Sequence, residues 1–251
     1  MSVPVNDLSY CRGKIGPWGS RASLAIQFAP QKEKVPLTGI FALQNEWESV
    51  VTSEHASDLA SIRLAWWEDQ LETGRELSNH PVIRLLSLSG TFDVLPLTRL
   101  IQALRSYRAL VLDAQPECEL RASAILRESH GVFLHWTTLN RMNDIPDLPL
   151  CHLATASWLA QRLAAPSLRT SGKGWAPQAE ILVAAHEELR AGLDACAPFL
   201  RHPACRSIRI IAALTELEIH GFERSGNSTH PNAIPVKLWR AWHAARNEQR
   251  I

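Results

Sequence analysis

Apolar residues recur at helical spacing in one segment after another of this chain. Residues 97–111 and 182–200 carry the longest stripes, with apolar side chains at i, i+3, i+4 and i+7. Shorter stripes of the same kind run through residues 37–51, 59–67 and 208–217. A half-buried strand would instead alternate apolar and polar residues, and no comparable stretch of the sequence does so. The sequence therefore predicts an all-α fold.

Residues that typically begin or end helices support this interpretation. Pro36 suits the first turn of a helix, and Asp58 and Asp93 suit N-cap positions. Gly90 and the glycines of residues 221–226 fall where helices are expected to stop. Because helices with one apolar stripe must bury it against one another, we expect a bundle of roughly eight helices.

The length of the chain and its breaks bear on domain organisation. The chain has 251 residues, of which 46% are apolar, so it can bury a substantial core. The two longer breaks in the helical pattern, residues 142–149 and 166–177, do not resemble flexible interdomain linkers. We therefore predict a single domain over residues 1–251.

Charge and cysteine usage exclude several classes of protein. The 26 basic and 25 acidic residues leave a formal charge of +1, which gives no overall attraction to nucleic acid. No run of about 18 apolar residues could cross a membrane, and residues 1–10 do not resemble a secretory signal. The five cysteines are an odd number without a CxxC pair, which is typical of reduced thiols. We expect a cytoplasmic protein with no nucleic-acid partner and at most peripheral membrane contact.

Motifs of common catalytic and metal sites are missing from the sequence. It contains no GxSxG nucleophile elbow and no GxxxxGK[ST] or GxGxxG phosphate-binding loop. His186 begins a segment like the HExxH zinc motif, but Arg190 stands where the second histidine would be. His202 and Cys205, with Cys196 upstream, lack the further ligands that a zinc site needs. These patterns predict no catalytic residue, no metal site and no cofactor.

Nine tryptophans include the adjacent pair Trp66 and Trp67. Adjacent residues point about 100° apart on a helix, so one of the two can lie in the core while the other reaches a groove or a neighbouring helix. Core packing is the ordinary role of such side chains, and a stacking surface for a ligand is the alternative.

Six short motifs follow one another along the chain. They are residues 28–30 (FAP), 41–52 (FALQNEWESVVT), 62–71 (IRLAWWEDQL), 80–82 (HPV), 172–177 (GKGWAP) and 235–242 (PVKLWRAW). In this order and at about these distances they resemble the squalene/phytoene synthase family. The resemblance covers roughly residues 10–245, which we expect to form the core of the domain.

The resemblance implies an isoprenoid-synthase-like bundle in which two prenyl diphosphates are condensed. In that family two acidic clusters face each other across a cavity and bind Mg²⁺, which stabilises the diphosphate leaving group. By the same resemblance, the pocket positions of this chain are Phe41, Asn45, Glu48, Ser49, Thr52, Arg63, Trp158 and Arg162.

The acidic residues of the first cluster are largely replaced in this chain. Alignment of residues 41–43 with the family's YAF motif places Glu48, Ser49 and Thr52 on the three positions of the cluster. Asn45 then stands at the position of the preceding arginine. One carboxylate of three is therefore retained.

The second acidic cluster is absent from its expected helix. Residues 148–179 contain neither Asp nor Glu, and Arg162 stands about where an acidic metal ligand would be. A guanidinium at that position repels a divalent cation. We therefore expect metal binding of the family kind to be lost. If Arg162 faces inward, we expect it to pair with Glu46 or Glu48, and the alternative is a solvent-facing position.

Two functions remain open at this point. The degenerate motifs resemble a divergent branch of the family that includes the mitochondrial complex I assembly factor, in which the fold is kept without evident prenyl condensation. The first hypothesis is a non-catalytic protein that binds a partner protein, or an isoprenoid or lipid ligand. The alternative is an active Mg²⁺-dependent prenyltransferase with unconventional ligands, for instance Glu48, Glu54 and Asp58.

Overall fold

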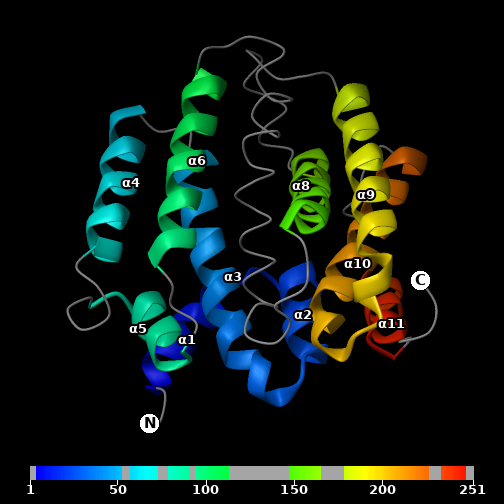
Figure 1. Cartoon of the computed structure of the whole chain (residues 1–251), viewed down its shortest axis with the longest axis horizontal. Coiled ribbons are helices and arrows are strands. Elements are labelled where there is room, and N and C mark those ends of the chain that lie inside the picture. The colour runs from blue at the N-terminus through cyan, green and yellow to red at the C-terminus, as the bar shows by residue number, and fades with distance from the viewer. Residues whose placement is uncertain are drawn as a thin grey trace.

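In a computed structural model of the chain, the described residues are 4–52, 57–72, 79–90, 94–112, 147–164, 178–225 and 233–246. Every regular element in these residues is a helix (Figure 1), which confirms the all-α prediction. The elements are α1 (Val5–Lys14), α2 (Arg21–Phe28), α3 (Gln31–Thr52), α4 (Ser57–Glu72), α5 (Pro81–Leu88), α6 (Val94–Leu112), α8 (Asp147–Ala164), α9 (Gln178–Leu200), the short 3₁₀-helix η2 (Pro203–Cys205), α10 (Arg206–Ser225) and α11 (Ala233–Arg246).

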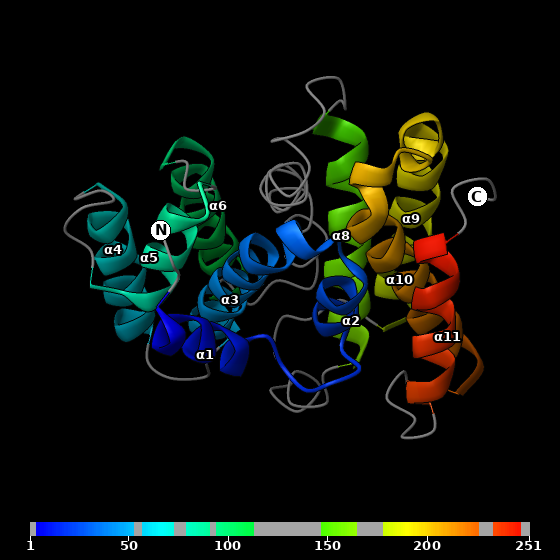
Figure 2. The same ribbon diagram turned by 90° about the horizontal axis from the view of Figure 1, so that it is seen from below.

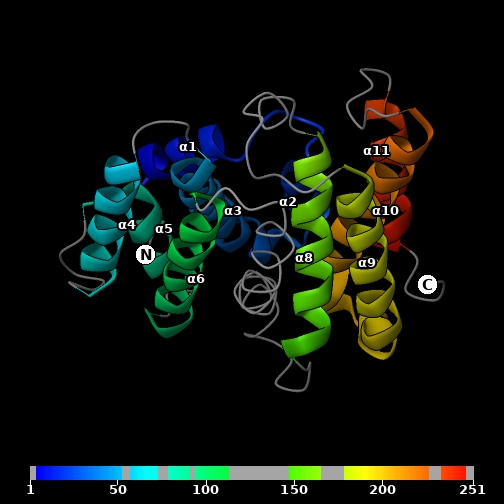
Figure 3. The same ribbon diagram turned by 90° about the horizontal axis from the view of Figure 1, so that it is seen from above.

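The helices pack in two neighbouring groups. In the first group, α3 packs against α1, α4, α5 and α6. In the second group, α8 packs along α9, and α10 packs against α8, α9 and α11. Figure 2 shows the two groups side by side, and Figure 3 shows α8 to α11 from the opposite side. Seven of the eight pocket positions predicted from the sequence lie on α3 and α8, one helix from each group, whereas Arg63 lies on α4.

Helix α2 belongs to the second group although it precedes α3 in the sequence. It packs against α10 and α11 as well as against α3. Its side chains Leu24 and Ala25 are fully buried. The buried apolar residues of both groups form one continuous cluster, to which α2 contributes. The prediction of a single domain over residues 1–251 also covers residues outside the described ranges and stays a prediction.

Two expectations about helix ends are wrong. Pro36 lies inside α3, which begins five residues earlier at Gln31. A proline there leaves the carbonyl of Lys32 without its helical partner, and Lys32 lies on an exposed part of the helix. The expected stop within residues 221–226 is wrong at Gly221, which lies inside α10, although the helix does end within this range, at Ser225. The helix continues through this glycine because Phe222 next to it is buried, and such packing outweighs the helix penalty of one glycine, about 1 kcal/mol.

Other local expectations are confirmed. Gly90 follows the end of α5 with φ of +72°, a backbone conformation that glycine adopts readily. Trp67 is buried with 3% of its surface exposed, whereas Trp66 is 44% exposed. The two adjacent rings therefore take the two different environments that helical geometry predicts. Of the helices in the described residues, none is long and apolar enough to cross a membrane.

Candidate functional site

The predicted pocket begins where α3 and α8 approach each other. Glu48 on α3 is half-buried, and both of its carboxylate oxygens accept hydrogen bonds from amide groups. Gln44 Nε2 donates to Oε1 at 2.7 Å, and Gln161 Nε2 on α8 donates to Oε2 at 3.3 Å. The carboxylate therefore bridges the two helices through amide contacts.

The next residue on α8, Arg162, faces the interior. Its exposed fraction is 7%, so the solvent-facing alternative is wrong. The guanidinium carbon lies 4.8 Å from the centre of the Trp158 ring, a cation–π arrangement. Trp158 is itself 5% exposed and lies on a helix whose alanines 154, 156 and 160 are also buried. A positive charge and an aromatic ring thus occupy the part of α8 where the family would carry acidic residues.

The remaining pocket positions on α3 have structural contacts. Phe41 is buried in the core. Asn45 donates from Nδ2 to the backbone carbonyl of Lys14 at 2.7 Å, which ties α3 to the end of α1. Ser49 is exposed and donates its hydroxyl hydrogen to the carbonyl of Glu46 at 2.7 Å. Thr52 is the last residue of α3, and its side chain lies outside the described residues.

Arg63, the remaining predicted position, lies elsewhere. It is exposed on α4, and Figure 2 shows α4 at the left edge of the molecule with α3 between it and α8. The alternative hypothesis needs two further metal ligands besides Glu48. Both Glu54 and the side chain of Asp58 lie outside the described residues. The structure thus brings Glu48 close to α8 and leaves Arg63 apart from it.

Glu46, one of the two carboxylates expected to pair with Arg162, pairs with residues of α1 instead. Lys14 Nζ lies 2.9 Å from Oε1 of Glu46, and the Tyr10 hydroxyl donates to the same oxygen at 2.6 Å. Burial acts to raise the pKa of Glu46, but the bonds from Lys14 and Tyr10 outweigh it and the pKa is lowered. This cluster was not predicted, because spacing within one helix does not show which residues of another helix it meets.

His80 lies beside this cluster and begins α5. Its Nδ1 accepts a hydrogen bond from the backbone N–H of Val82 at 3.3 Å, while Pro81 occupies the first helical position. Its ring lies edge-on to the rings of Tyr10, Trp66 and Trp67, with centroids 4.5 to 5.8 Å away. Burial lowers the pKa of His80, which favours the neutral ring that the Nδ1 contact requires. The HPV motif therefore acts here as a helix start.

A buried ionic network connects α2 with the second group. Arg21 Nε lies 3.2 Å from Oε2 of Glu218, and Lys237 Nζ lies 2.6 Å from Oε1 of the same carboxylate. Arg21 Nη1 also donates to the hydroxyls of Ser157 and Thr215, at 2.7 and 3.0 Å. The lysine of the PVKLWRAW motif thus joins α11 to α10 and α2 through Glu218.

The described residues at the contact between α3 and α8 do not provide the donor set that Mg²⁺ prefers. Mg²⁺ is usually held by carboxylates and water in octahedral geometry. Glu48 is the acidic side chain described at this contact, and both of its oxygens already accept amide hydrogens. In the part of the chain that the structure describes, one group of three metal-ligating side chains converges, on α9 and α10.

Comparison with known proteins supports the fold. No family model and no curated protein matches the chain. The solved structure of a dehydrosqualene synthase in complex with ligand matches it with a TM-score of 0.73 and 16% sequence identity. The match covers 97% of this chain and 95% of that chain. The chain therefore has the helical fold of the isoprenoid synthases, as the sequence motifs predicted.

Proposed function

We propose that this chain is a squalene/phytoene synthase-like protein that does not condense prenyl diphosphates and acts as a binding or assembly protein. The observation that carries the proposal is the state of Glu48. Its oxygens accept hydrogen bonds from Gln44 on α3 and Gln161 on α8, so the one acidic residue left in the first motif links these two helices. The degenerate acidic motifs are the feature by which the chain resembles the divergent branch that includes the mitochondrial complex I assembly factor.

The charge on α8 supports the same proposal. Arg162 is buried against Trp158, and residues 148–179 contain neither Asp nor Glu. Two like charges 4 Å apart repel each other by about 4 kcal/mol at an effective dielectric of about 20, and the double charge of Mg²⁺ doubles this. A buried guanidinium at this position is therefore a poor neighbour for a Mg²⁺–diphosphate group.

The outer face of α4 supports a protein partner. Leu59, Ile62 and Trp66 lie along this face with 57%, 63% and 44% of their surfaces exposed. The opposite face of α4 is buried through Ala60, Leu64, Trp67 and Leu71. A helix with apolar side chains on both faces is typical of a helix that is covered on both sides. We propose that a partner protein covers this face and that the two proteins meet in the cytoplasm.

An isoprenoid or lipid ligand is the other form that a binding function can take. The dehydrosqualene synthase of the same fold is described as a complex with a ligand. In this chain, α8 carries buried Trp158 and Arg162, which combine an aromatic surface with a positive charge. This pair suits an apolar molecule with an anionic end.

A working prenyltransferase is the second candidate function. The likeness to a dehydrosqualene synthase over 97% of this chain favours it. It requires metal ligands in addition to Glu48, and Glu54 and Asp58 are the nearest acidic residues that follow in the sequence.

Diphosphate release separates the two functions. The purified full chain is incubated with Mg²⁺ and farnesyl or geranylgeranyl diphosphate, with an active prenyl synthase as the positive control. We expect no released diphosphate and no rise in melting temperature with Mg²⁺ and a diphosphate analogue, because a ligand that does not bind the native state cannot stabilise it. Mg²⁺-dependent release that is lost in Glu48→Gln would establish catalysis and refute the proposal.

A further inference from the structure

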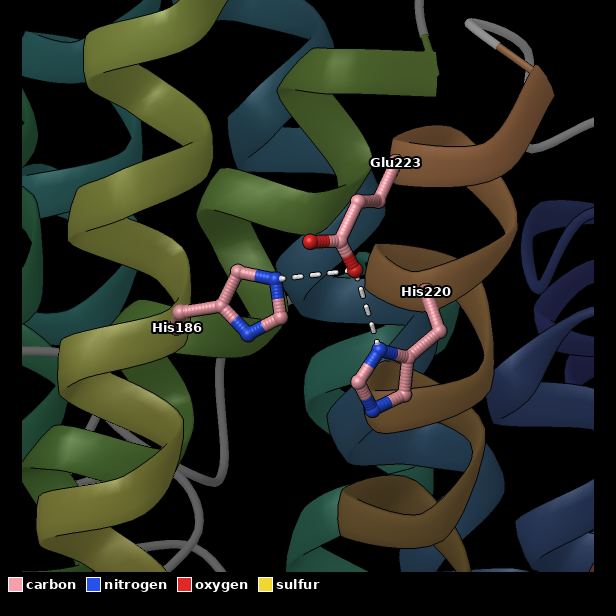
Figure 4. Close-up of side chains that lie close together, drawn as sticks. All are labelled: His186, His220 and Glu223. Carbon is pink, nitrogen blue, oxygen red and sulfur yellow. Dashed lines mark hydrogen bonds and ion pairs between the residues drawn. The ribbon is translucent and has the colours of Figure 1, made fainter.

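A cluster of two histidines and a glutamate lies on the surface where α9 meets α10 (Figure 4). Nδ1 of His220 is 3.3 Å from Oε2 of Glu223, and Nε2 of His186 is 3.8 Å from the same oxygen. The three ligand atoms all lie within 4.8 Å of one another. We propose that His186, His220 and Glu223 form a binding site for a divalent cation of the zinc class.

The helical hairpin of α9 and α10 brings these side chains together. His186 lies about four turns before the end of α9, and His220 lies about four turns after the start of α10. Because the two helices pack against each other on either side of the turn at η2, residues at equal distances from that turn become neighbours. Glu223 follows His220 by three residues and therefore lies on the same face of α10.

The imidazole of His186 has a nitrogen that lacks a hydrogen bond. Its Nε2 atom is buried, and no hydrogen-bond partner for it exists within the described part of the chain. The distance of 3.8 Å to Glu223 is too long for a hydrogen bond. Buried polar atoms in proteins are normally satisfied. Figure 4 shows this nitrogen directed at the carboxylate of Glu223, so a cation between the two groups would satisfy both.

The donor set selects the kind of cation. Two imidazole nitrogens and one carboxylate oxygen are typical zinc ligands, whereas Mg²⁺ and Ca²⁺ prefer oxygen ligands alone. With bonds of about 2.0–2.1 Å, ligand atoms of a tetrahedral zinc site lie roughly 3.3–3.5 Å apart. The separations of 3.3 and 3.8 Å from the two imidazole nitrogens to the carboxylate oxygen lie close to this geometry, and all three ligand atoms lie within 4.8 Å of one another. The exposed sides of His220 and Glu223 leave the fourth position to water.

A second histidine–glutamate pair in the same region differs in a useful way. Nδ1 of His152 on α8 lies 2.6 Å from Oε2 of Glu188 on α9, which is a direct hydrogen bond. It joins one imidazole to one carboxylate, and among the described residues no third metal-ligating side chain converges on it. This pair is therefore a matched control for the site on α9 and α10.

The proposed cation would join α9 to α10 about four turns away from the turn that connects them. Binding to the native chain alone stabilises that chain as the concentration of free metal rises. The site does not depend on the proposed function, because none of its residues lies at the contact between α3 and α8.

Zinc titration of the full chain tests the site. The protein is treated with a chelator and titrated with ZnCl₂ by calorimetry and by thermal melting, and with CoCl₂ by visible absorption. We expect one zinc ion per chain, a higher melting temperature with zinc, the absorption bands of tetrahedral Co²⁺, and no response to MgCl₂. His186→Ala, His220→Ala and Glu223→Gln should each weaken zinc binding by roughly tenfold or more, because two ligands hold the ion less tightly than three.

His152→Ala and Glu187→Gln serve as controls and should bind zinc like the unaltered chain. Glu187 is exposed and is the neighbour of His186 on α9. His220 and Glu223 are both exposed, so their variants should melt like the unaltered chain in the absence of metal. The proposal is overturned if the unaltered chain binds no zinc at about 1 mM or if the three ligand variants bind it equally well. The latter result would place the ion at other groups, such as the free thiols.

Discussion

Arg21 of α2 and Glu218 of α10 form an ion pair in the interior, with Nε and Oε2 3.2 Å apart. The side chains are 12% and 9% exposed, and Lys237 of α11 reaches the other oxygen of the same carboxylate. One glutamate thus offsets two buried positive charges that come from opposite ends of the sequence.

Glu218→Gln should destabilise the chain strongly. The substitution leaves Arg21 and Lys237 without their counter-charge in a desolvated position, which costs about 3–5 kcal/mol. Glu216→Gln is the matched control. Glu216 pairs with Arg240 and joins α10 to α11, as Glu218 and Lys237 do, but its side chain is more exposed. Loss of that pair should cost about 1 kcal/mol or less. Chemical denaturation of the two variants measures the difference, and equal effects would contradict the buried role of Glu218.

Gly192→Ala should also be destabilising. A methyl group at Gly192 on α9 would lie 2.8 Å from the backbone nitrogen of Leu153 and 2.7 Å from its Cδ2 atom. A backbone atom cannot move aside as a side chain can, so we expect a loss of about 1–3 kcal/mol. Gly221→Ala on α10 is the control, since nothing lies within 4 Å of the added atom. It should raise stability by up to about 1 kcal/mol. If the melting temperatures of Gly192→Ala and Gly221→Ala shift in the same direction, the close contact between α8 and α9 at Gly192 does not limit stability.

Stability should fall in mild acid through His80. Burial lowers the pKa of His80 below its ordinary value of 6.5, so the folded chain binds a proton less readily than the unfolded chain. The stability that the neutral ring provides is therefore complete above about pH 6.5 and is lost as pH falls through the folded pKa. Protonation of Nδ1 also removes the acceptor for the N–H of Val82.

His80→Asn tests this pH dependence, because asparagine retains a cap acceptor without a titrating group. Denaturation between pH 7 and pH 5 should give a flatter stability curve for this variant than for the unaltered chain. His202→Asn is the control, since His202 caps η2 through the same atom but is exposed. Its curve should follow that of the unaltered chain. If the stability of His80→Asn depends on pH as steeply as that of the unaltered chain, the pH dependence does not come from protonation of His80.

Ile62→Asp should abolish binding of a partner protein and leave the fold intact. Ile62 is 63% exposed, so we expect its substitution to change stability by about 0.5 kcal/mol or less. Val183→Asp on α9 is the control, because Val183 is 57% exposed on a different helix. The measurement compares the amounts of each protein captured from the native host by the unaltered chain, by Ile62→Asp and by Val183→Asp. If α4 binds a partner, at least one protein should be captured by the unaltered chain and by Val183→Asp but not by Ile62→Asp. If no captured protein shows this pattern, the proposed role of α4 is wrong.

The sequence predicted the helices well where one strong apolar stripe repeats. The stripes of residues 97–111 and 182–200 correspond to α6 and α9, and Trp66 and Trp67 take opposite environments as their spacing requires. Local rules for helix ends were less successful at Pro36 and Gly221. Both residues lie in long helices whose packed faces stabilise the helix more than one unfavourable residue destabilises it.

Contacts between helices could not be predicted in the same way. The HExxH-like segment at His186 lacks its second histidine four residues later, but the ring of His220 on α10 lies with its centroid 5.4 Å from that of His186. Likewise, Glu46 was expected near Arg162 and instead meets Lys14 and Tyr10. Periodicity shows which face of a helix is apolar, but the partner of each polar side chain depends on how whole helices are arranged.

The position of α2 has a consequence for the synthesis of this chain. A ribosome completes α2 before most of the sequence exists, yet its buried residues pack against α10 and α11 near the other end. Until α10 and α11 have been made, Leu24 lacks part of its packing surface and Arg21 lacks its counter-charge on Glu218. In a nascent chain the α2 segment therefore stays exposed until α10 and α11 have been made, which makes chaperone contact with this segment advantageous.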